Sequence, residues 1–284
     1  MTNDSISTNV DREKEYVLGT GADELERLAL QHRFWSDAAH QAWQAAKIRI
    51  GQRVLDVGCG PGYASFDLAQ LVTRQGAVVG VDESSSFIDY LNWQANLRGL
   101  SQLRGIVGDV HNISDALRDE APFDLAFARW VLCFVPDPAA VIREVASQLK
   151  PGGRFVIHDY FNYQSFTVAP RTAVQDRAVS ATIESWHARG GNTDVAGAIP
   201  GMLQSVGLEL EHTSVHARMA RTDEMMFQWP LIWWRIYAPK LVSMGFLSQA
   251  DCDRLLSDFE QMKDQTDQFV QCPLVYEFIA RRTK

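Results

Sequence analysis

The sequence has few of the features that mark secreted, zinc-binding or membrane-spanning proteins. Its four cysteines are Cys59, Cys133, Cys252 and Cys272, and no two of them stand at the C-x-x-C spacing of a zinc site. We therefore expect reduced thiols and no metal site. No apolar run reaches the roughly 18 residues of a membrane span, and residues 1–11 lack the basic and apolar segments of a signal peptide. These absences predict a cytoplasmic protein with no membrane partner.

Basic residues are also too few and too scattered for a nucleic-acid-binding surface. The chain has 35 acidic and 27 basic residues and a net charge of −8. An acidic surface repels phosphate backbones, so we do not expect nucleic acid as a partner. The densest basic cluster, Arg281, Arg282 and Lys284, is typical of a solvated C-terminal tail. The length of 284 residues and the 46% hydrophobic content indicate one large globular domain with insertions.

Between residues 50 and 160, short apolar segments alternate with helical segments. We expect strands at 54–57, 77–81, 103–107, 123–128 and 154–158, and helices at 63–74, 84–98 and 137–149. The last helix has clear signals, because Asp137 can cap it and Pro138 suits its first position. Wholly apolar strands joined by helices predict a doubly wound, mostly parallel α/β sheet.

The pattern differs outside this region. Helices are expected over 22–46, over 165–189 and over 196–206, and strands over 208–215 and 273–279. About fifty residues rich in Trp and Met separate the last two strands, which is longer than a hairpin needs and is typical of a functional insertion.

A glycine-rich loop follows the first expected strand, in the segment VLDVGCGPG at 54–62. Glycines at a strand-to-helix turn let the backbone approach a ligand closely. A dinucleotide site needs G-x-G-x-x-G, and here its third glycine is replaced by Tyr63. Asp56, two residues before Gly58, would repel a pyrophosphate. The loop therefore indicates a ligand with a cationic amino group.

Two further acids stand at the ends of the second and third strands. Asp82 can accept hydrogen bonds from ribose hydroxyls, and Asp109 lies where it can accept from an adenine amine. The carboxyl ends of parallel strands meet at one sheet edge, so the three acids predict one nucleoside site. The alternatives are a helix N-cap for Asp82 and a surface turn for Asp109.

Five motifs then occur in order: VLDVGCGPG, VVGVDES, GDV, FDLAFARWVLCFVPDP and LKPGGRFVIHDY. Over roughly residues 50–160 they resemble the successive motifs of class I S-adenosylmethionine-dependent methyltransferases of the small-molecule type. The resemblance implies a seven-stranded sheet of order 3-2-1-4-5-7-6 with strand 7 antiparallel. It also implies S-adenosyl-L-methionine as cofactor and S-adenosyl-L-homocysteine as product.

The resemblance also implies roles for individual residues. The loop Gly58–Gly62 would hold the methionine part of the cofactor, Asp82 the ribose and Phe87 the adenine, while Arg129 lies at the methionine end. The full cofactor-binding set is Asp56, Gly58, Gly60, Gly62, Asp82, Glu83, Phe87, Asp109, Val110 and Arg129. The chain departs from the family at Cys133, where small-molecule members often carry His, which argues against proton transfer there.

The resemblance further suggests a division of the chain within a single domain. Residues 1–48 would form an N-terminal helical lid and 49–160 the cofactor-binding core. Residues 161–207 would hold a helical insertion and the last crossover helix, and 208–284 the sixth and seventh strands with an inserted helical cap.

Candidates for the chemistry and for the acceptor follow the fifth strand and fill the insertions. His158 and Asp159 could act as a general base or position the acceptor; the alternative for His158 is a packed, hydrogen-bonded strand residue. The expected acceptor pocket comprises Tyr16, Trp35, Tyr160, Trp186, Trp229, Trp233 and Tyr237, for which core packing is the alternative.

The function that the sequence favours is methyl transfer to a small molecule in a capped, aromatic-lined pocket. Two alternatives stay open, a protein methyltransferase and a module that binds the cofactor without chemistry. The acidic charge argues against RNA as the acceptor.

Overall fold

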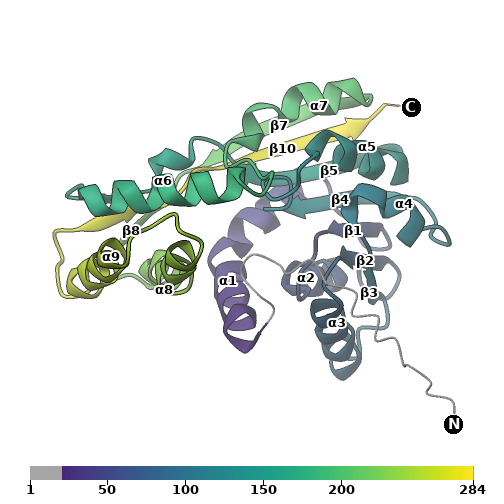
Figure 1. Cartoon of the computed structure of the whole chain (residues 1–284). Helices are drawn as coiled ribbons and strands as arrows, with labels where there is room; N and C mark the ends of the chain where they lie inside the picture. The colour runs from purple at the N-terminus through teal and green to yellow at the C-terminus, as the bar shows by residue number, and fades with distance from the viewer. Residues whose placement is uncertain (1–20, 284) are drawn as a thin grey trace, which may run out of the picture.

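A computed structural model describes residues 21–283 and contains a seven-stranded sheet of order β3-β2-β1-β4-β5-β10-β7 (Figure 1). Its strands are β1 (Arg53–Val57), β2 (Ala77–Asp82), β3 (Leu103–Val107), β4 (Phe123–Arg129), β5 (Leu149–Tyr160), β7 (Leu208–His216) and β10 (Val275–Arg282). Strands β1 to β5 pair in parallel, and β10 is antiparallel to both β5 and β7. The predicted order is confirmed, because the last strand of the chain inserts between the fifth and sixth strands of the sheet.

Helices cover both faces of this sheet. They are α2 (Tyr63–Val72), α3 (Ser85–Leu97), α4 (Ile113–Ala116) and α5 (Pro138–Gln148), with the short η1 (Val110–Asn112) before α4. On one face Val54, Val78 and Phe127 pack with α2 and α3, and on the other Leu55 and Val79 pack with α4 and α5. Side chains alternate along a strand, so two covered faces require continuous apolar runs.

The predicted start of the helix at 137–149 is confirmed in α5. The Asp137 carboxylate accepts from the Ala140 amide at 2.9 Å, and Pro138 occupies the first turn of α5. The Ser84 hydroxyl caps α3 by accepting from the Phe87 amide at 3.3 Å. Helix α5 ends at Gln148 as expected, but β5 begins at once, and its irregular start contains Gly152 at φ +80°. The fifth strand is therefore longer than the expected 154–158.

The sequence gives no sign of a second, three-stranded sheet. It has the order β6-β9-β8 and comprises β6 (Thr167–Ala169), β8 (Met219–Arg221) and β9 (Phe269–Gln271). The expected helix over 165–189 is wrong at its start, since η2 (Tyr163–Ser165) and β6 precede α6 (Ala173–His187). Strands of three residues show no readable alternation, and their partners lie far away in the chain.

The remaining helices gather beside the sheet. Helix α1 (Ala22–Ala45) contacts α2, α8 and β10, while α8 (Gln228–Ser243) and α9 (Gln249–Met262) form the insertion between β7 and β10 (Figure 1). The expected helix over 196–206 is divided into η3 (Val195–Gly197) and α7 (Ile199–Ser205), and η4 (Met225–Phe227) leads into α8. Within residues 21–283, none of the helices combines the length and apolarity needed to cross a bilayer.

Candidate functional site

One cavity of about 420 Å³ opens where the parallel strands end. Two groups of side chains line it. The strand-end wall comprises Asp56, Gly58, Cys59, Gly60, Asp82, Glu83, Phe87, Asp109, Val110, His111 and Arg129. The aromatic wall comprises Trp130, Phe134, Tyr160, Tyr163, Phe166, Trp186, Trp229 and Trp233. The cavity thus joins the expected nucleoside site to residues of α6 and α8.

The glycine loop needs glycine at two positions for steric reasons. Gly58 has φ +60°, and a Cβ there would lie 2.6 Å from the Val131 Cγ2. Gly62 has φ +86° and directly precedes α2, where a Cβ would lie 2.6 Å from Leu91. Both backbones are in the left-handed region that favours glycine. Gly62 does not line the cavity, so its effect is to shape the turn.

Asp82 joins the glycine loop to the end of β2. Its two carboxylate oxygens accept from the Gly60 amide at 2.8 Å and the Ser84 amide at 3.0 Å. Ser84, not Asp82, caps α3, so the N-cap alternative for Asp82 does not apply. Burial raises the Asp82 pKa, and the two amides oppose that rise. Each oxygen keeps a lone pair for a ligand hydroxyl.

Asp56 is buried beside the loop and has an unusual acidity. Burial raises its pKa to about 7, although the Ser65 hydroxyl donates to it at 2.5 Å and the charge of Arg129 favours the ionised form. A buried carboxylate of this kind ionises readily when a cation arrives beside it. This property fits an amino group as the ligand.

Arg129 is the last residue of β4, at the same sheet edge, and offers a donor to a ligand. Its Nη1 is buried and has no hydrogen-bond partner among residues 21–283, while its Nη2 donates to the His32 Nδ1 at 2.9 Å. Burial lowers the Arg129 pKa to about 10, so the side chain remains charged at neutral pH. A buried guanidinium donor without a partner is costly unless a ligand satisfies it.

Asp109 lies at the open end of the strand-end wall. It caps η1 by accepting from the His111 amide at 2.8 Å, and its carboxylate also lies 2.8 Å from the His111 Nδ1. The surface-turn alternative therefore describes part of its environment, yet both residues line the cavity. The sequence did not single out His111, whose buried Nε2 has no partner in the described part of the chain.

Helix α1 supplies one side of the cavity, which the sequence did not predict in detail. Arg27, Leu28, Gln31 and His32 line it, at the i, i+1, i+4, i+5 spacing of one helix face. His32 Nε2 also lies 3.0 Å from the Asp67 carboxylate of α2, and burial lowers the His32 pKa. Neutral His32 can therefore accept from Arg129 and donate to Asp67, which fixes α1 over the strand-end wall.

The aromatic wall is a set of touching rings. Trp130 stacks on Tyr160 and on Trp229, with ring centroids 5.7 and 6.2 Å apart. Arg27 also lines this part of the cavity, 5.8 Å from the Trp233 ring centroid, and Glu24 holds its guanidinium at 2.7 and 2.8 Å. Tyr160, Trp186, Trp229 and Trp233 were expected in the pocket and do line it.

Other expected pocket residues lie outside the cavity wall. Trp35 and Tyr237 are fully buried in the core, and the Tyr237 hydroxyl is bonded to Ser185 and to the Trp186 indole at 2.9 and 3.0 Å. Both rings pack behind wall residues. Tyr16 lies outside the described residues.

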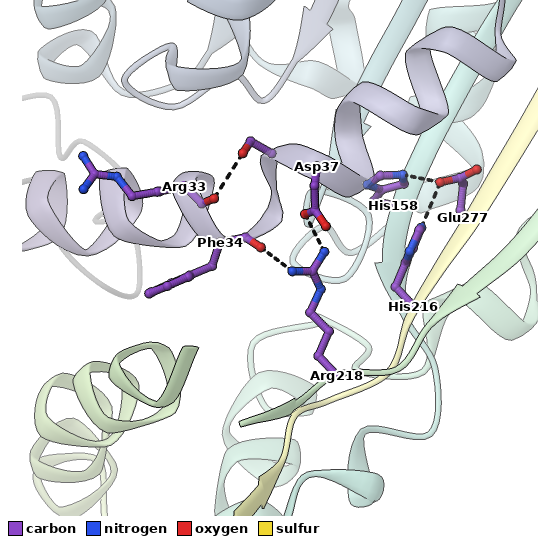
Figure 2. Close-up of polar contacts among 8 residues, drawn as sticks. Arg33, Phe34, Asp37, His158, His216, Arg218 and Glu277 are labelled. Atoms are coloured by element: carbon purple, nitrogen blue, oxygen red, sulfur yellow. Dashed lines mark hydrogen bonds and ion pairs between the residues drawn. The ribbon is translucent and has the colours of Figure 1, made fainter. Parts of the chain in front are cut away.

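His158 and Asp159 are also fully buried and do not line the cavity. His158 Nε2 lies 2.9 Å from the Glu277 carboxylate, which agrees with the alternative of a hydrogen-bonded strand residue (Figure 2). Burial opposes ionisation of Glu277, but the hydrogen bonds of His158 and His216 lower its pKa to about 2. Asp159 accepts from the Tyr160 amide at 2.9 Å, and burial raises its pKa to about 6.

Comparison with known proteins identifies the family. A family model described as a methyltransferase domain matches residues 48–226, more than half of the chain. The chain belongs to this methyltransferase family. The class I sheet order agrees with this assignment.

The chain is similar to several named proteins over part of its length. It is 36% identical over 128 residues to the 2-phytyl-1,4-naphtoquinone methyltransferase of Synechococcus elongatus, covering 45% of this chain and 53% of that one. It is 41% identical over 109 residues to the ubiquinone biosynthesis O-methyltransferase of Xylella fastidiosa, covering 38% and 41%. The chain spans between 31% and 53% of the length of the curated relatives it matches. A solved structure from Bacillus halodurans has a TM-score of 0.59 at 17% identity, covering 86% of this chain and 98% of that one, which shows the shared fold.

The residues of the strand-end wall fit S-adenosylmethionine, the cofactor of this family. The buried Arg129 Nη1 has no partner within residues 21–283, which suits the carboxylate of the methionine part. Asp56 suits its ammonium group, and Asp82 has acceptor capacity for the ribose. The donor and acceptor types thus match the cofactor at both ends.

Proposed function

We propose that this protein transfers the methyl group of S-adenosylmethionine to a small-molecule acceptor. The observation that carries the proposal is that the strand-end wall and the aromatic wall line the same cavity. A donor and an acceptor held in one cavity can react without diffusing between sites. An apolar, aromatic surface of this kind suits a flat, largely apolar acceptor.

Each residue of the expected cofactor-binding set has a role in this proposal. Asp56 and Arg129 hold the two charged groups of the methionine part, Asp82 and Glu83 hold the ribose, and Phe87 packs against the adenine. Asp109 and Val110 border the adenine edge. Gly58, Gly60 and Gly62 allow the loop backbone to lie close to the methionine part of the cofactor. All of these residues except Gly62 line the cavity.

The chain supplies alignment and exclusion of water more than proton transfer. When bound, the cofactor provides an already activated methyl carbon, so the main requirement is an aligned acceptor. Tyr160 and Tyr163 line the aromatic wall, but burial raises both pKa values well above the ordinary range. Asp159 lies behind the wall and holds the Tyr160 amide, so we assign it to positioning of the wall. We accordingly expect an acceptor that is nucleophilic without a strong base.

The arrangement of helices supports a covered site. Helix α1 would act as a lid over the cofactor, since its His32 joins Arg129 to Asp67 across the cavity. Helix α8 would act as a cap over the acceptor, since it contributes Trp229 and Trp233. The names of the matched relatives, a naphthoquinone methyltransferase and an enzyme of ubiquinone biosynthesis, support an aromatic acceptor.

A transfer experiment with methyl-labelled cofactor tests this proposal. The protein is incubated with the labelled cofactor and a cell extract, which is then separated into small-molecule, protein and RNA fractions. We expect label in the small-molecule fraction, and a loss of that label in Trp229→Ala. Label in protein would favour a protein methyltransferase, and label in no fraction, despite normal cofactor binding, would favour a module without chemistry.

A further inference from the structure

Three of the seven histidines surround one buried glutamate in the antiparallel part of the sheet. Glu277 of β10 pairs with His158 of β5 on one side and with Ser214 of β7 on the other. His212 and His216 lie two residues to either side of Ser214. Because side chains alternate along a strand, all four groups face the same side of the sheet.

The side chains of His158 and His216 converge on the Glu277 carboxylate (Figure 2). The Nε2 atoms of His158 and His216 each lie 2.9 Å from the same Glu277 oxygen, and the His212 Nε2 lies 3.5 Å from the other. The ligand atoms of His158, His216 and Glu277 all lie within 4.8 Å of one another. Ligand atoms around a tetrahedral zinc ion with bonds of 2.0–2.1 Å are about 3.3 Å apart, so the two His–Glu contacts of 2.9 Å would lengthen by about 0.4 Å to admit an ion.

The cluster runs from the interior to the surface. The His158 side chain is fully buried and that of Glu277 is 4% exposed, whereas His216 is 16% and His212 50% exposed. An ion can therefore enter past His212 and reach the buried ligands. His212 lies on the solvent side, 3.5 Å from the second Glu277 oxygen, outside the group of three whose ligand atoms all lie within 4.8 Å of one another.

The charge of the cluster favours a cation. Within residues 21–283, Glu277 forms no ion pair with a lysine or arginine. A buried carboxylate without a lysine or arginine partner has a negative charge that a bound cation would offset. Two imidazoles and one carboxylate are a ligand set for divalent transition metals, whereas magnesium and calcium prefer oxygen ligands alone.

We infer that His158, His216 and Glu277 form a binding site for a divalent transition-metal ion such as Zn²⁺, which His212 borders on the solvent side. The site is separate from the methyl-transfer cavity, which none of these residues lines. It would connect three strands, β5, β10 and β7. The sequence did not predict it, because the spacing of these histidines is not that of a local motif.

An ion at this site would also stiffen the contact between β7 and α1. Two residues beyond His216, Arg218 donates to the Phe34 carbonyl and the Asp37 carboxylate of α1 (Figure 2). The Arg218 guanidinium also lies 4.4 Å from the Trp35 ring centroid. Trp35 packs against Trp229 of the aromatic wall at 5.3 Å. The proposed ion therefore has a structural link to the cavity.

Calorimetric titration of the chelator-treated full chain with ZnCl₂ tests the inference. We expect one saturable site in the wild type, with binding weakened about tenfold or more in His216→Ala and in Glu277→Gln. Glu277→Gln keeps the size and a hydrogen-bond acceptor, so it separates loss of a ligand from loss of folding. His40→Ala is the matched control. It removes a histidine from a separate cluster, in which His32 and His40 both contact the Asp67 carboxylate.

Substitution with Co²⁺ gives a second readout, because its visible absorption becomes stronger when the ion passes from six-coordinate water to a protein site with fewer ligands. We expect this stronger absorption in the wild type and in His40→Ala, and its loss in Glu277→Gln. Wild-type protein that binds neither ion, or a Glu277→Gln variant that binds Zn²⁺ as tightly as wild type, would overturn the proposed site. Neither result would bear on methyl transfer, which uses other residues.

Discussion

At the scale of the residue, three carboxylates share one cavity wall but have different partners. Asp56 accepts a hydrogen bond from the Ser65 hydroxyl, and Asp82 accepts two from backbone amides. Asp109 accepts one from the His111 amide. These partners set what each acid can still bind. The buried Asp56 suits a cation, whereas Asp82 and Asp109 keep acceptor capacity for neutral hydroxyl and amine groups.

Replacement of Asp82 should weaken cofactor binding strongly. Loss of hydrogen bonds to a charged acceptor is worth about 1.5–3 kcal/mol, or roughly 10–100-fold in affinity. We therefore expect Asp82→Ala to bind S-adenosylhomocysteine that much more weakly in a calorimetric titration. Asp89→Ala, which removes an exposed acid from the neighbouring α3, is the control. Equal binding by Asp82→Ala and wild type would contradict the ribose assignment.

Asp56 should make cofactor binding depend on pH. Its folded pKa of about 7 lies above the ordinary value of 3.8, so the free protein holds a proton that a cationic ligand must displace below pH 7. The same raised pKa means that the free protein loses stability as pH rises from about 4 to about 7.

We expect the affinity for S-adenosylhomocysteine to rise about eightfold between pH 6 and pH 7.5 as the Asp56 carboxyl ionises. In Asp56→Asn the rise below pH 7.5 should disappear. A wild-type affinity that does not change over this range would argue against Asp56 as the partner of the amine.

At the scale of the element, helix α1 is held by contacts from several parts of the chain. The Tyr63 hydroxyl of α2 donates to the Leu25 carbonyl at 3.0 Å, and Arg218, just beyond β7, donates to the Phe34 carbonyl and the Asp37 carboxylate. These contacts lie at both ends of the face that lines the cavity. The position of the helix is therefore set by tertiary contacts more than by helix propensity.

Removal of the Arg218 side chain should loosen α1. Arg218→Ala loses two hydrogen bonds and the contact with the Trp35 ring, so we expect the free energy of unfolding to fall by about 1–2 kcal/mol in urea titrations followed by tryptophan fluorescence. The control is Arg254→Ala, which removes an exposed ion pair with Asp258 and should change stability by less than about 0.5 kcal/mol. Equal stability of Arg218→Ala and wild type would show that the contact does not hold the helix.

Local patterns were sufficient to predict the parallel part of the sheet and the strand-end wall. The apolar runs of β1 to β4, the glycines at 58–62 and the acids at strand ends are all local signals. Helix α1 was predicted as a helix, but which of its faces lines the cavity depends on packing against distant residues. The sequence shows that Arg27 and Gln31 are four residues apart and thus share a helix face, but it does not show that this face lines the cavity.

Features made by distant segments were not predictable in the same way. Strand β9 pairs with β6 and β8, about fifty to a hundred residues away in the chain, and such short strands are stabilised by pairing and not by local preference. The Glu277 cluster joins residues 119 and 61 positions apart. His158 was considered for catalysis because of its place at the end of the expected fifth strand, whereas its orientation in β5 turns it toward Glu277.

At the scale of the whole molecule, one contiguous core joins the sheet to the inserted helices. Leu55 and Val57 of β1 belong to the same buried cluster as Trp234 of α8 and Phe259 of α9. The insertion is therefore packed as part of the main body. The cavity lies between these two regions, which explains why its walls differ so strongly in polarity.

A crystal structure of the protein with S-adenosylhomocysteine tests the central claim most directly. The account predicts the ribose at Asp82, the adenine between Phe87 and Asp109, and the sulfur facing the aromatic wall with free volume beside Trp130 and Trp229. A nucleoside bound elsewhere, or a sulfur facing a closed wall with no room for an acceptor, would contradict it.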